Sequence, residues 1–547
     1  MELHGVGVGR GMAMGPILRM PDPLPEPPAS RHTGDAAAEY ATVQHSLAAV
    51  AAELTATGVR AGGTAKDVLQ AAAMMAQDPA LADDIKARIE SGWSGERAVF
   101  DAFDAFRVIL LGMGGLMAER ATDLTDVAQR VRAHLRGVPV PSVPSSDSPF
   151  ILVAADLAPA DTALLDLDRV LGFITRDGGP TSHTAILARS RSIPAIVGVS
   201  KALELSEGTV VVMDAAAGLV TSDPDDALIS LANRRIAARA AASTEPIVEG
   251  ALADGTRVPL LANVGSPKDA PEAVALGAEG VGLFRTEFLF LDSRTAPTVA
   301  EQQKKYTELL DYFPGKRVVV RALDAGADKP LSFLAPEHEQ NPALGVRGLR
   351  ALRASEQVLV DQLTALKGAQ DETAADLWVM APMVADVEET EYFVQLAKAL
   401  GLQTVGVMAE VPSLAVMADH VFSSADFVSI GTNDLTQYTL AADRTLARVA
   451  SYQDPWHPAV LRLVKLVGDA GATADKGVGI CGEAAADPQL AVVLVGLGAT
   501  SLSMTPAALA EVRAELATVT LQQARAKADA ALAAPTASAA RRAAASA

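Results

Sequence analysis

Residues 178–189 read Gly-Gly-Pro-Thr-Ser-His-Thr-Ala-Ile-Leu-Ala-Arg, and this stretch decides the fold of the first half of the chain. The apolar run 170–174 before it predicts a strand, and the paired glycines allow a tight turn. Thr181 and Ser182 are good N-cap residues for a helix over 184–189. The sequence therefore predicts a strand–turn–helix unit with His183 in or near the first helical turn.

His183 is the candidate reactive residue of this unit. Free backbone N–H groups and the positive end of the helix dipole favour an anion at a helix start. A cationic imidazole is disfavoured there, so we expect a neutral ring with a lone pair available for attack. A phosphoryl group on that ring would meet a surface that can hold it. The alternative interpretation is a capping turn that carries an ordinary surface histidine.

Composition limits the class of protein. A chain of 547 residues suggests two to four domains. No run of about 18 uncharged apolar residues occurs, so we expect no membrane insertion, and no secretory signal is visible at the start. The single cysteine suits a cytoplasmic location. The net charge of −20 argues against nucleic acid as the main partner and would suit a basic protein partner.

The first half shows one α/β domain that is interrupted by helices. Glycine-rich residues 1–22 predict its first strand, and 146–232 predict the remainder. Proline-rich segments at 21–28 and 139–149 separate these parts from a helical pattern over 30–140, which Asp78-Pro79 and Ser91–Gly95 divide into antiparallel helices. A linker over 233–249 follows, which consists of an Arg/Ala helix over 233–242 and a hinge at 243–246.

The second half alternates short apolar runs with helical segments, which indicates a parallel α/β fold. Eight strands over 250–520 fit a (β/α)8 TIM barrel. The alanine-rich tail, 521–547, predicts a last helix that frays, and we assign it no function. The predicted strands are Pro259–Asn263, Gly280–Glu287, Arg317–Leu323, Leu377–Met383, Thr404–Glu410, Phe427–Thr432, Gly477–Gly482 and Thr500–Met504.

In a TIM barrel the function belongs to the C-terminal ends of the strands, and arginines occur there. Arg285 and Arg321 stand at or near the ends of apolar strands. Two guanidiniums can grip a substrate phosphate bidentately, although structural ion pairs are the alternative for either residue alone. Arg444 lies ten residues beyond Asp434, where it could pair with a substrate carboxylate.

Carboxylates and a thiol occur at the same ends. Glu410 closes one predicted strand and Asp434 follows the next, so the two could share Mg²⁺, which prefers one or two protein carboxylates with substrate oxygens and water. Two solvated carboxylates are the alternative. Cys481 ends the seventh strand, and a protonated thiol there can give a proton. A buried cysteine that serves packing alone is the competing interpretation.

Several strings together resemble a known family. Besides 178–189 they are Gly-Leu-Phe-Arg-Thr-Glu-Phe-Leu-Phe (282–290), Ser-Ile-Gly-Thr-Asn-Asp-Leu-Thr-Gln-Tyr (429–438) and Gly-Ile-Cys-Gly-Glu (479–483). They resemble Enzyme I of the bacterial sugar phosphotransferase system, the phosphoenolpyruvate–protein phosphotransferases, over residues 5–520. The resemblance implies a swivelling phosphohistidine α/β domain with an inserted all-α subdomain, followed by a TIM barrel that binds phosphoenolpyruvate.

The resemblance also implies a reaction. The phosphoryl group of phosphoenolpyruvate passes to His183 and then to a histidine of the carrier protein HPr, and pyruvate is released. Mg²⁺ is the implied cofactor. The implied site residues are His183 with Thr162 orienting its ring, Arg285, Arg321, Asn433, Asp434 and Arg444 for phosphoenolpyruvate, Glu410 and Asp434 for Mg²⁺, and Cys481 as the proton donor to the enolate carbon.

Partners follow from the same resemblance. The helical subdomain would bind HPr, and the barrel would form a homodimer. The sequence departs from the family at Gly112–Gly115, where acidic residues are usual, so docking there could differ. The alternatives are an enzyme like phosphoenolpyruvate synthase or pyruvate phosphate dikinase without its ATP domain, and a non-catalytic regulatory relative. The sequence does not identify the sugars or the carrier downstream.

Overall fold

The protein divides into two compact units, Met1–Ile236 and Ala237–Ala547. The computed structural model describes residues 1–8, 11–61, 63–113, 115–143, 146–157, 161, 165–166, 168–178, 183–190, 193–215, 218–242, 247–290, 295–325, 331, 334, 339–444, 446, 449 and 452–547.

An eight-stranded mixed sheet forms the centre of the first unit, in the order β1-β8-β7-β3-β4-β5-β6-β2. Strand β3 pairs in parallel with β4, although more than 120 residues separate them in sequence. The chain therefore leaves the sheet after β3 and returns to it at β4, as predicted. The strands are β1 (Glu2–His4), β2 (Val6–Val8), β3 (Met12–Arg19), β4 (Phe150–Ala154), β5 (Val170–Thr175), β6 (Ala195–Val197), β7 (Val210–Asp214) and β8 (Leu219–Ser222).

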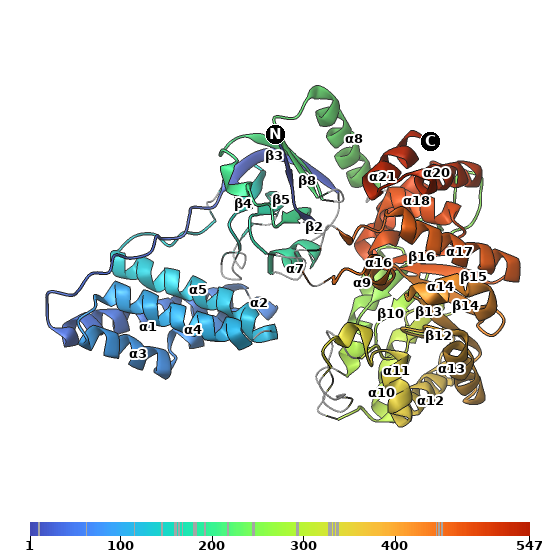
Figure 1. Ribbon diagram of the computed structural model, residues 1–547, viewed down its shortest axis with the longest axis horizontal. Coiled ribbons are helices and arrows are strands. Elements are labelled where there is room, and N and C mark those ends of the chain that lie inside the picture. The colour runs from blue at the N-terminus through green and yellow to red at the C-terminus, as the bar shows by residue number, and fades with distance from the viewer. Residues whose placement is uncertain are drawn as a thin grey trace. The chain divides into compact units, whose positions relative to one another are not determined.

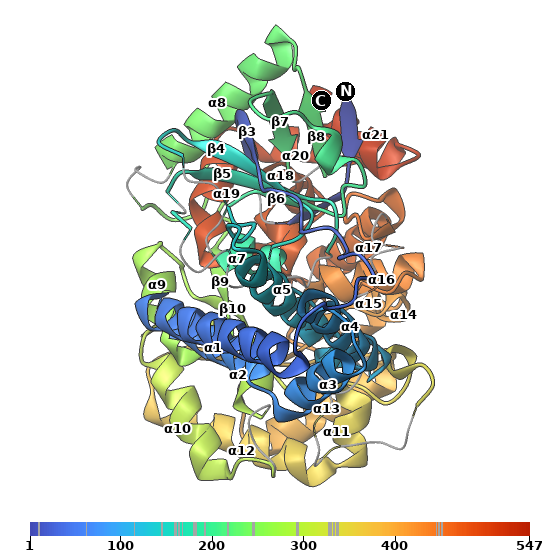
Figure 2. The ribbon, with the colours of Figure 1, turned by 90° about the vertical axis from the view of Figure 1, so that its left-hand side faces the viewer.

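The excursion between β3 and β4 is helical. Its helices are α1 (Ala36–Ala61), α2 (Gly63–Ala76), α3 (Pro79–Glu90), α4 (Gly95–Met113) and α5 (Gly115–Arg136), and they pack around one apolar core (Figure 2). Asp78 caps α3, since its carboxylate accepts hydrogen bonds from the N–H groups of Ala80 and Leu81 at 2.8 and 3.3 Å. The Asp-Pro pair thus starts a helix, as the sequence indicates. Within the glycine-rich departure at 112–115, Gly114 lies outside the described residues.

Helix α7 (His183–Ser190) follows β5 along the chain and begins at His183, which confirms the predicted strand and the predicted helix. Gly179 and Pro180 of the predicted turn lie outside the described residues. The predicted N-cap residues Thr181 and Ser182 lie outside the described residues, as does Thr162. Helix α8 (Asp226–Ala242) follows the sheet, and the division between the two units falls within it.

The second unit contains a closed barrel in which all eight strands run in parallel (Figure 1). Each predicted strand is present within a few residues, because strands buried on both faces read as apolar runs. The strands are β9 (Leu260–Val264), β10 (Val281–Phe284), β11 (Arg317–Arg321), β12 (Asp376–Ala381), β13 (Thr404–Ala409), β14 (Phe427–Gly431), β15 (Gly477–Cys481) and β16 (Ser501–Met504).

Helices surround the barrel and cover its apolar outer face (Figure 1). They are α9 (Ala270–Ala275), α10 (Val299–Leu310), α11 (Leu349–Ala354), α12 (Glu356–Glu372), α13 (Val387–Ala399), α14 (Pro412–Val416), α15 (Ala418–Val421), α16 (Thr432–Leu440), α17 (Pro458–Ala474), α18 (Pro488–Gly496) and α19 (Leu509–Leu516). Arg321 and Cys481 are the last residues of their strands, and Glu410 directly follows β13. The parallel arrangement therefore brings the candidate residues to one end of the barrel.

The alanine-rich tail does not fray, which corrects the expectation from sequence. It forms α20 (Leu521–Ala533) and α21 (Ala537–Ser546), whose inward alanines are buried. A Cβ at Gly496 would lie 2.2 Å from the carbonyl oxygen of Ala524, so α18 and α20 approach closely. Small side chains permit this packing. The alanine-rich composition by itself does not show that the tail packs in this way. None of the described helices has the length and apolar character that a membrane span requires.

Candidate active site

Arg321 lies at the centre of a buried charge cluster at the C-terminal end of the barrel. Its guanidinium donates to Glu287 and forms an ion pair with Asp324 at 3.3 Å. The Oγ1 of Thr286 donates to the backbone carbonyl of Arg321 at 3.0 Å and fixes the end of β11. Burial alone would lower the pKa of Arg321, but Glu287 and Asp324 raise it above its usual range. This guanidinium is permanently charged and held in place.

A second buried arginine, Arg347, bridges two carboxylates of the cluster. Its Nη2 lies 3.1 Å from Asp324 Oδ2, and its Nη1 lies 3.1 Å from Asp434 Oδ1. Nη1 also donates to the hydroxyl of Tyr438 at 3.1 Å. Asp434 lies in the first turn of α16, and its other oxygen is 3.4 Å from Arg444 Nη1. Arg347 and Arg444 therefore hold Asp434 from two sides.

Arg285 differs from the other arginines of the cluster. No described carboxylate lies within ion-pair distance of its guanidinium, and no described residue forms a hydrogen bond with it. Burial and the nearby charge of Arg321 lower the pKa of Arg285, whereas Glu287 acts in the opposite direction. A partly buried cation without a protein partner is costly unless another anion compensates it. Arg285 is the group in this cluster that can accept an external oxyanion.

Asp434 lies close enough to Glu410 to influence the pKa of Glu410. Burial, followed by the negative charges of Asp434 and Asp324, raises the pKa of Glu410 to about 7. One Glu410 oxygen accepts a hydrogen bond from the N–H of Met383 at 2.7 Å. A Cβ at Gly431 would lie 2.6 Å from the other oxygen, so only glycine leaves room for this carboxylate. The three carboxylates form a locally negative part of the cluster.

Asn433 and Cys481 complete the set predicted from sequence. Asn433 Oδ1 accepts from the backbone N–H of Glu483 at 3.2 Å, which links α16 to the segment after β15. The thiol of Cys481 is buried, and it accepts a hydrogen bond from the Ser429 hydroxyl at 3.3 Å. Burial raises the pKa of Cys481 to about 11, so the thiol keeps its proton at neutral pH. Arg285, Arg321 and Glu410 all influence this thiol electrostatically.

Family models match the chain in three successive parts. They are described as the N-terminal domain (residues 4–120), the mobile domain (146–218) and the PEP-binding domain (239–521) of PEP-utilising enzymes. A phosphoenolpyruvate-protein phosphotransferase of Streptomyces coelicolor is 52% identical over 99% of this chain and 98% of its own length. The chain belongs to the phosphoenolpyruvate–protein phosphotransferases.

Two further members of this phosphotransferase family are similar over almost the whole chain. The Haloferax volcanii protein is 42% identical over 96% of this chain and 95% of its own, and the Geobacillus stearothermophilus protein is 37% identical over 94% and 92%. Both carry the same name as the Streptomyces protein. The family assignment and the fold predicted from sequence are confirmed.

Sequence reasoning missed three side chains of the phosphotransferase cluster, which are Glu287, Asp324 and Arg347. Glu287 lies within the string 282–290, where the pattern alone assigns it no role. Asp324 stands three residues beyond Arg321, and Arg347 lies in Gly345-Val346-Arg347-Gly348, a segment without helical or strand periodicity. An arginine in a short glycine-bounded segment is the signal that the sequence offers for Arg347.

Proposed function

We propose that this phosphotransferase moves the phosphoryl group of phosphoenolpyruvate to His183 and then to a carrier protein. Arg285 carries the proposal for the barrel, because it is a guanidinium without a described carboxylate partner inside a cluster of charged side chains. A dianionic phosphate is the kind of group that such an arginine binds bidentately.

The remaining residues are proposed to bind different groups of the substrate or to hold these binding residues in place. Arg321 is pinned by Glu287 and Asp324, so it presents a fixed positive charge to the phosphoryl oxygens as they develop charge. Asn433, whose Oδ1 accepts from the Glu483 N–H, keeps its amide N–H groups for the substrate. Arg444 is partly exposed and pairs with Asp434 at 3.4 Å, which leaves it able to turn toward the substrate carboxylate. Arg347 keeps Asp324 and Asp434 in position.

Mg²⁺ is the proposed cofactor, and Glu410 and Asp434 are its proposed ligands. No group of three or more His, Cys, Asp or Glu side chains within the described ranges is arranged as a complete metal site. Two carboxylates nevertheless fit a metal that takes its other ligands from substrate and water. Burial and then the negative charges of Asp434 and Asp324 raise the pKa of Glu410, and a divalent cation would offset those charges. When bound, Mg²⁺ would neutralise charge on the phosphoryl oxygens.

Cys481 is the proposed proton donor to the carbon of enolpyruvate. Its thiol stays protonated at neutral pH because burial raises its pKa to about 11. The enolate that remains after phosphoryl transfer is a strong enough base to take this proton, and pyruvate results. In the other unit, the backbone of His183 begins α7, where helix N–H groups favour an attached phosphoryl group.

The carrier, the oligomer and the location are proposed with the reaction. HPr is the proposed carrier, with the bundle α1–α5 as its docking element, and the barrel units are proposed to form a homodimer. A cytoplasmic location fits the single, buried cysteine. An ATP-dependent enzyme such as phosphoenolpyruvate synthase or pyruvate phosphate dikinase is the less favoured alternative. The relatives that match over at least 92% of their own length carry the phosphotransferase name instead.

The test is incubation with isotopically labelled phosphoenolpyruvate and Mg²⁺ without nucleotide. We expect label on the parent protein, no label on His183→Ala, and parental labelling on His420→Ala, which removes an exposed histidine of α15. Purified HPr should then discharge the label. Labelling of His183→Ala, or labelling that requires ATP, would overturn the proposal.

A further inference from the structure

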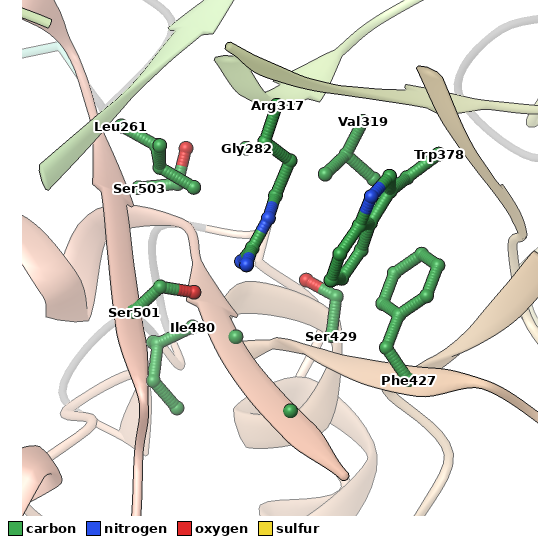
Figure 3. A pocket seen from close by; sticks show the side chains of 12 residues that line it. Leu261, Gly282, Arg317, Val319, Trp378, Phe427, Ser429, Ile480, Ser501 and Ser503 are labelled. Atoms are coloured by element: carbon green, nitrogen blue, oxygen red, sulfur yellow. The ribbon is translucent and has the colours of Figure 1, made fainter. Parts of the chain in front are cut away.

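A small cavity lies inside the barrel, at the end opposite the charge cluster. It is lined by residues from the first three positions of several strands, including Arg317, Ser429, Gly479 and Ser501 (Figure 3). Its volume is ≈ 20 Å³, which is enough for about one or two water molecules. The cavity exists because β15 carries Gly477 and Gly479 where barrel strands usually point larger side chains inward.

The cavity is lined by both polar and apolar side chains. The guanidinium of Arg317 reaches into it and stacks on the Trp378 ring at 3.8 Å from the ring centroid (Figure 3). Ser501 is buried, and its hydroxyl makes no hydrogen bond with any described residue. A cavity of this size holds water where polar groups offer it hydrogen bonds, whereas wholly apolar cavities stay dry. Gly479 is partly exposed although it lies in the middle of β15, so solvent reaches this depth.

Two hydroxyls converge on the space beside Gly479. A Cβ placed at Gly479 would lie 3.4 Å from Ser501 Oγ and 3.6 Å from Ser429 Oγ. A water molecule in this space is within hydrogen-bonding reach of both oxygens. Ser429 in turn donates its hydroxyl hydrogen to Cys481 Sγ at 3.3 Å. Ser429 therefore connects the cavity to the thiol from the side opposite the substrate end.

We propose that this cavity supplies protons to Cys481 through Ser429. The inference rests on the proposed role of Cys481 as proton donor. Once the thiol has given its proton to the enolate carbon, a thiolate remains inside the barrel and must be reprotonated. The charge cluster, where product and metal would lie in the proposed reaction, is the less direct route. The hydroxyl of Ser429 already points its hydrogen at the sulfur.

The proposed steps balance. The S–H bond of Cys481 breaks as the C–H bond of pyruvate forms, and the sulfur keeps the electron pair. The O–H bond of Ser429 then breaks as a new S–H bond forms, while the serine oxygen takes a proton from cavity water. Bulk water at the N-terminal end of the barrel replaces that proton. The net change is one proton taken from solvent, with no oxidant or reductant. Ser429 acts through Cys481 and is a positioning residue.

Gly479→Ala and Ser429→Ala interrupt the path in different ways. Alanine at 479 meets both hydroxyls at ordinary van der Waals distance, so it fits while displacing the water. Alanine at 429 removes the relay itself. Ser429→Thr keeps a hydroxyl and should restore function. Val478→Ala is the matched control, because this neighbouring side chain of β15 packs in the core outside the barrel.

Two rates on each full-length variant test the proposal. The first is phosphorylation of His183 by phosphoenolpyruvate. The second is deuterium uptake into the methyl group of pyruvate in D₂O with Mg²⁺, followed by NMR. We expect Gly479→Ala and Ser429→Ala to slow methyl exchange by about tenfold or more, a fraction of the ~10²–10⁴ that a positioned proton donor contributes. The rate of single-turnover phosphorylation of His183 should stay near the parental value in both alanine variants. Val478→Ala and Ser429→Thr should keep both rates near the parental values.

The outcomes separate the two claims. Parental methyl exchange in both alanine variants, with His183 still phosphorylated, would overturn the relay and leave the proposed function intact. Equal slowing in Val478→Ala would also overturn it, because the effect would then come from strain in β15. Loss of phosphorylation in the parent would instead contradict the proposed function.

Discussion

Replacing Arg347 with leucine should destabilise the barrel strongly. The guanidinium is buried and lies 3.1 Å from one oxygen each of Asp324 and Asp434. Removing one partner of a buried ion pair leaves uncompensated charge and costs about 3–5 kcal/mol. Here two carboxylates lose the same partner, while Asp324 keeps Arg321 at 3.3 Å and Asp434 keeps Arg444 at 3.4 Å, so we expect a value within this range. A loss of that size changes the folding equilibrium constant by a factor of about 10²–10⁴.

Urea unfolding followed by tryptophan fluorescence measures this loss. The chain has three tryptophans, of which Trp378 and Trp456 belong to the barrel unit. A Trp93→Phe background therefore restricts the signal to the barrel. Adding Asp324→Asn to Arg347→Leu should recover part of the stability, because one of the stranded charges disappears.

Lys305→Ala provides a control for charge removal at the surface. Lys305 pairs with Glu308 on α10 at 3.1 Å, and both side chains are well exposed. Such pairs contribute about 0–1 kcal/mol. A loss below about 1 kcal/mol in Arg347→Leu, similar to that control, would show that solvent screens the cluster and would refute the reasoning.

Three further predictions concern single positions. Cys481 is the only cysteine and its pKa is raised to about 11, so thiolate absorbance should appear only as the pH approaches 11. The stability that this thiol contributes should be complete below its usual pKa and lost as the pH rises from there to about 11. A midpoint of the absorbance change near pH 9 would contradict the burial of the thiol. Glu410→Gln should abolish Mg²⁺-dependent turnover. At pH 8, above the raised pKa of about 7, the same variant should be as stable as the parent or more stable, because the buried site disfavours the ionised carboxylate. A clear loss of stability in calorimetric melting would disprove this. Gly482→Ala should lower the free energy of unfolding by about 1–3 kcal/mol and weaken substrate binding. The reason is that Gly482 has φ +120° and that a Cβ there would lie 2.6 Å from Thr432 Oγ1 and 3.2 Å from Asn433 Oδ1. An unchanged urea unfolding curve would contradict the predicted strain.

The strands and the helix starts could be predicted from the sequence because each depends on local patterns. Val318–Val320 is apolar on both faces, as a buried parallel strand requires. Asp78 followed by proline has both features of a helix start. Once eight such strands are placed in one barrel, residues at their ends must share a site, so Arg321, Glu410 and Cys481 followed from topology.

The partners within the site could not be predicted in the same way. Arg347 comes from a segment that is neither strand nor periodic helix, and its function depends on Asp324 and Asp434 from distant parts of the chain. The cavity behind Cys481 depends on the absence of a side chain at Gly479 and on two serines from neighbouring strands. A glycine in a strand signals close approach or space, and only the folded chain shows which.

The central claim is that the barrel binds phosphoenolpyruvate through Arg285. Calorimetric titration of phosphoenolpyruvate with Mg²⁺ into His183→Ala, which cannot accept the phosphoryl group in this account, measures binding alone. Replacing Arg285 with methionine in that protein removes no ion pair with a described residue, so the unfolding midpoint should stay equal or rise. We predict affinity at least about tenfold weaker, which corresponds to ~1.4 kcal/mol or more. Unchanged affinity for phosphoenolpyruvate in the Arg285→Met protein would contradict the account.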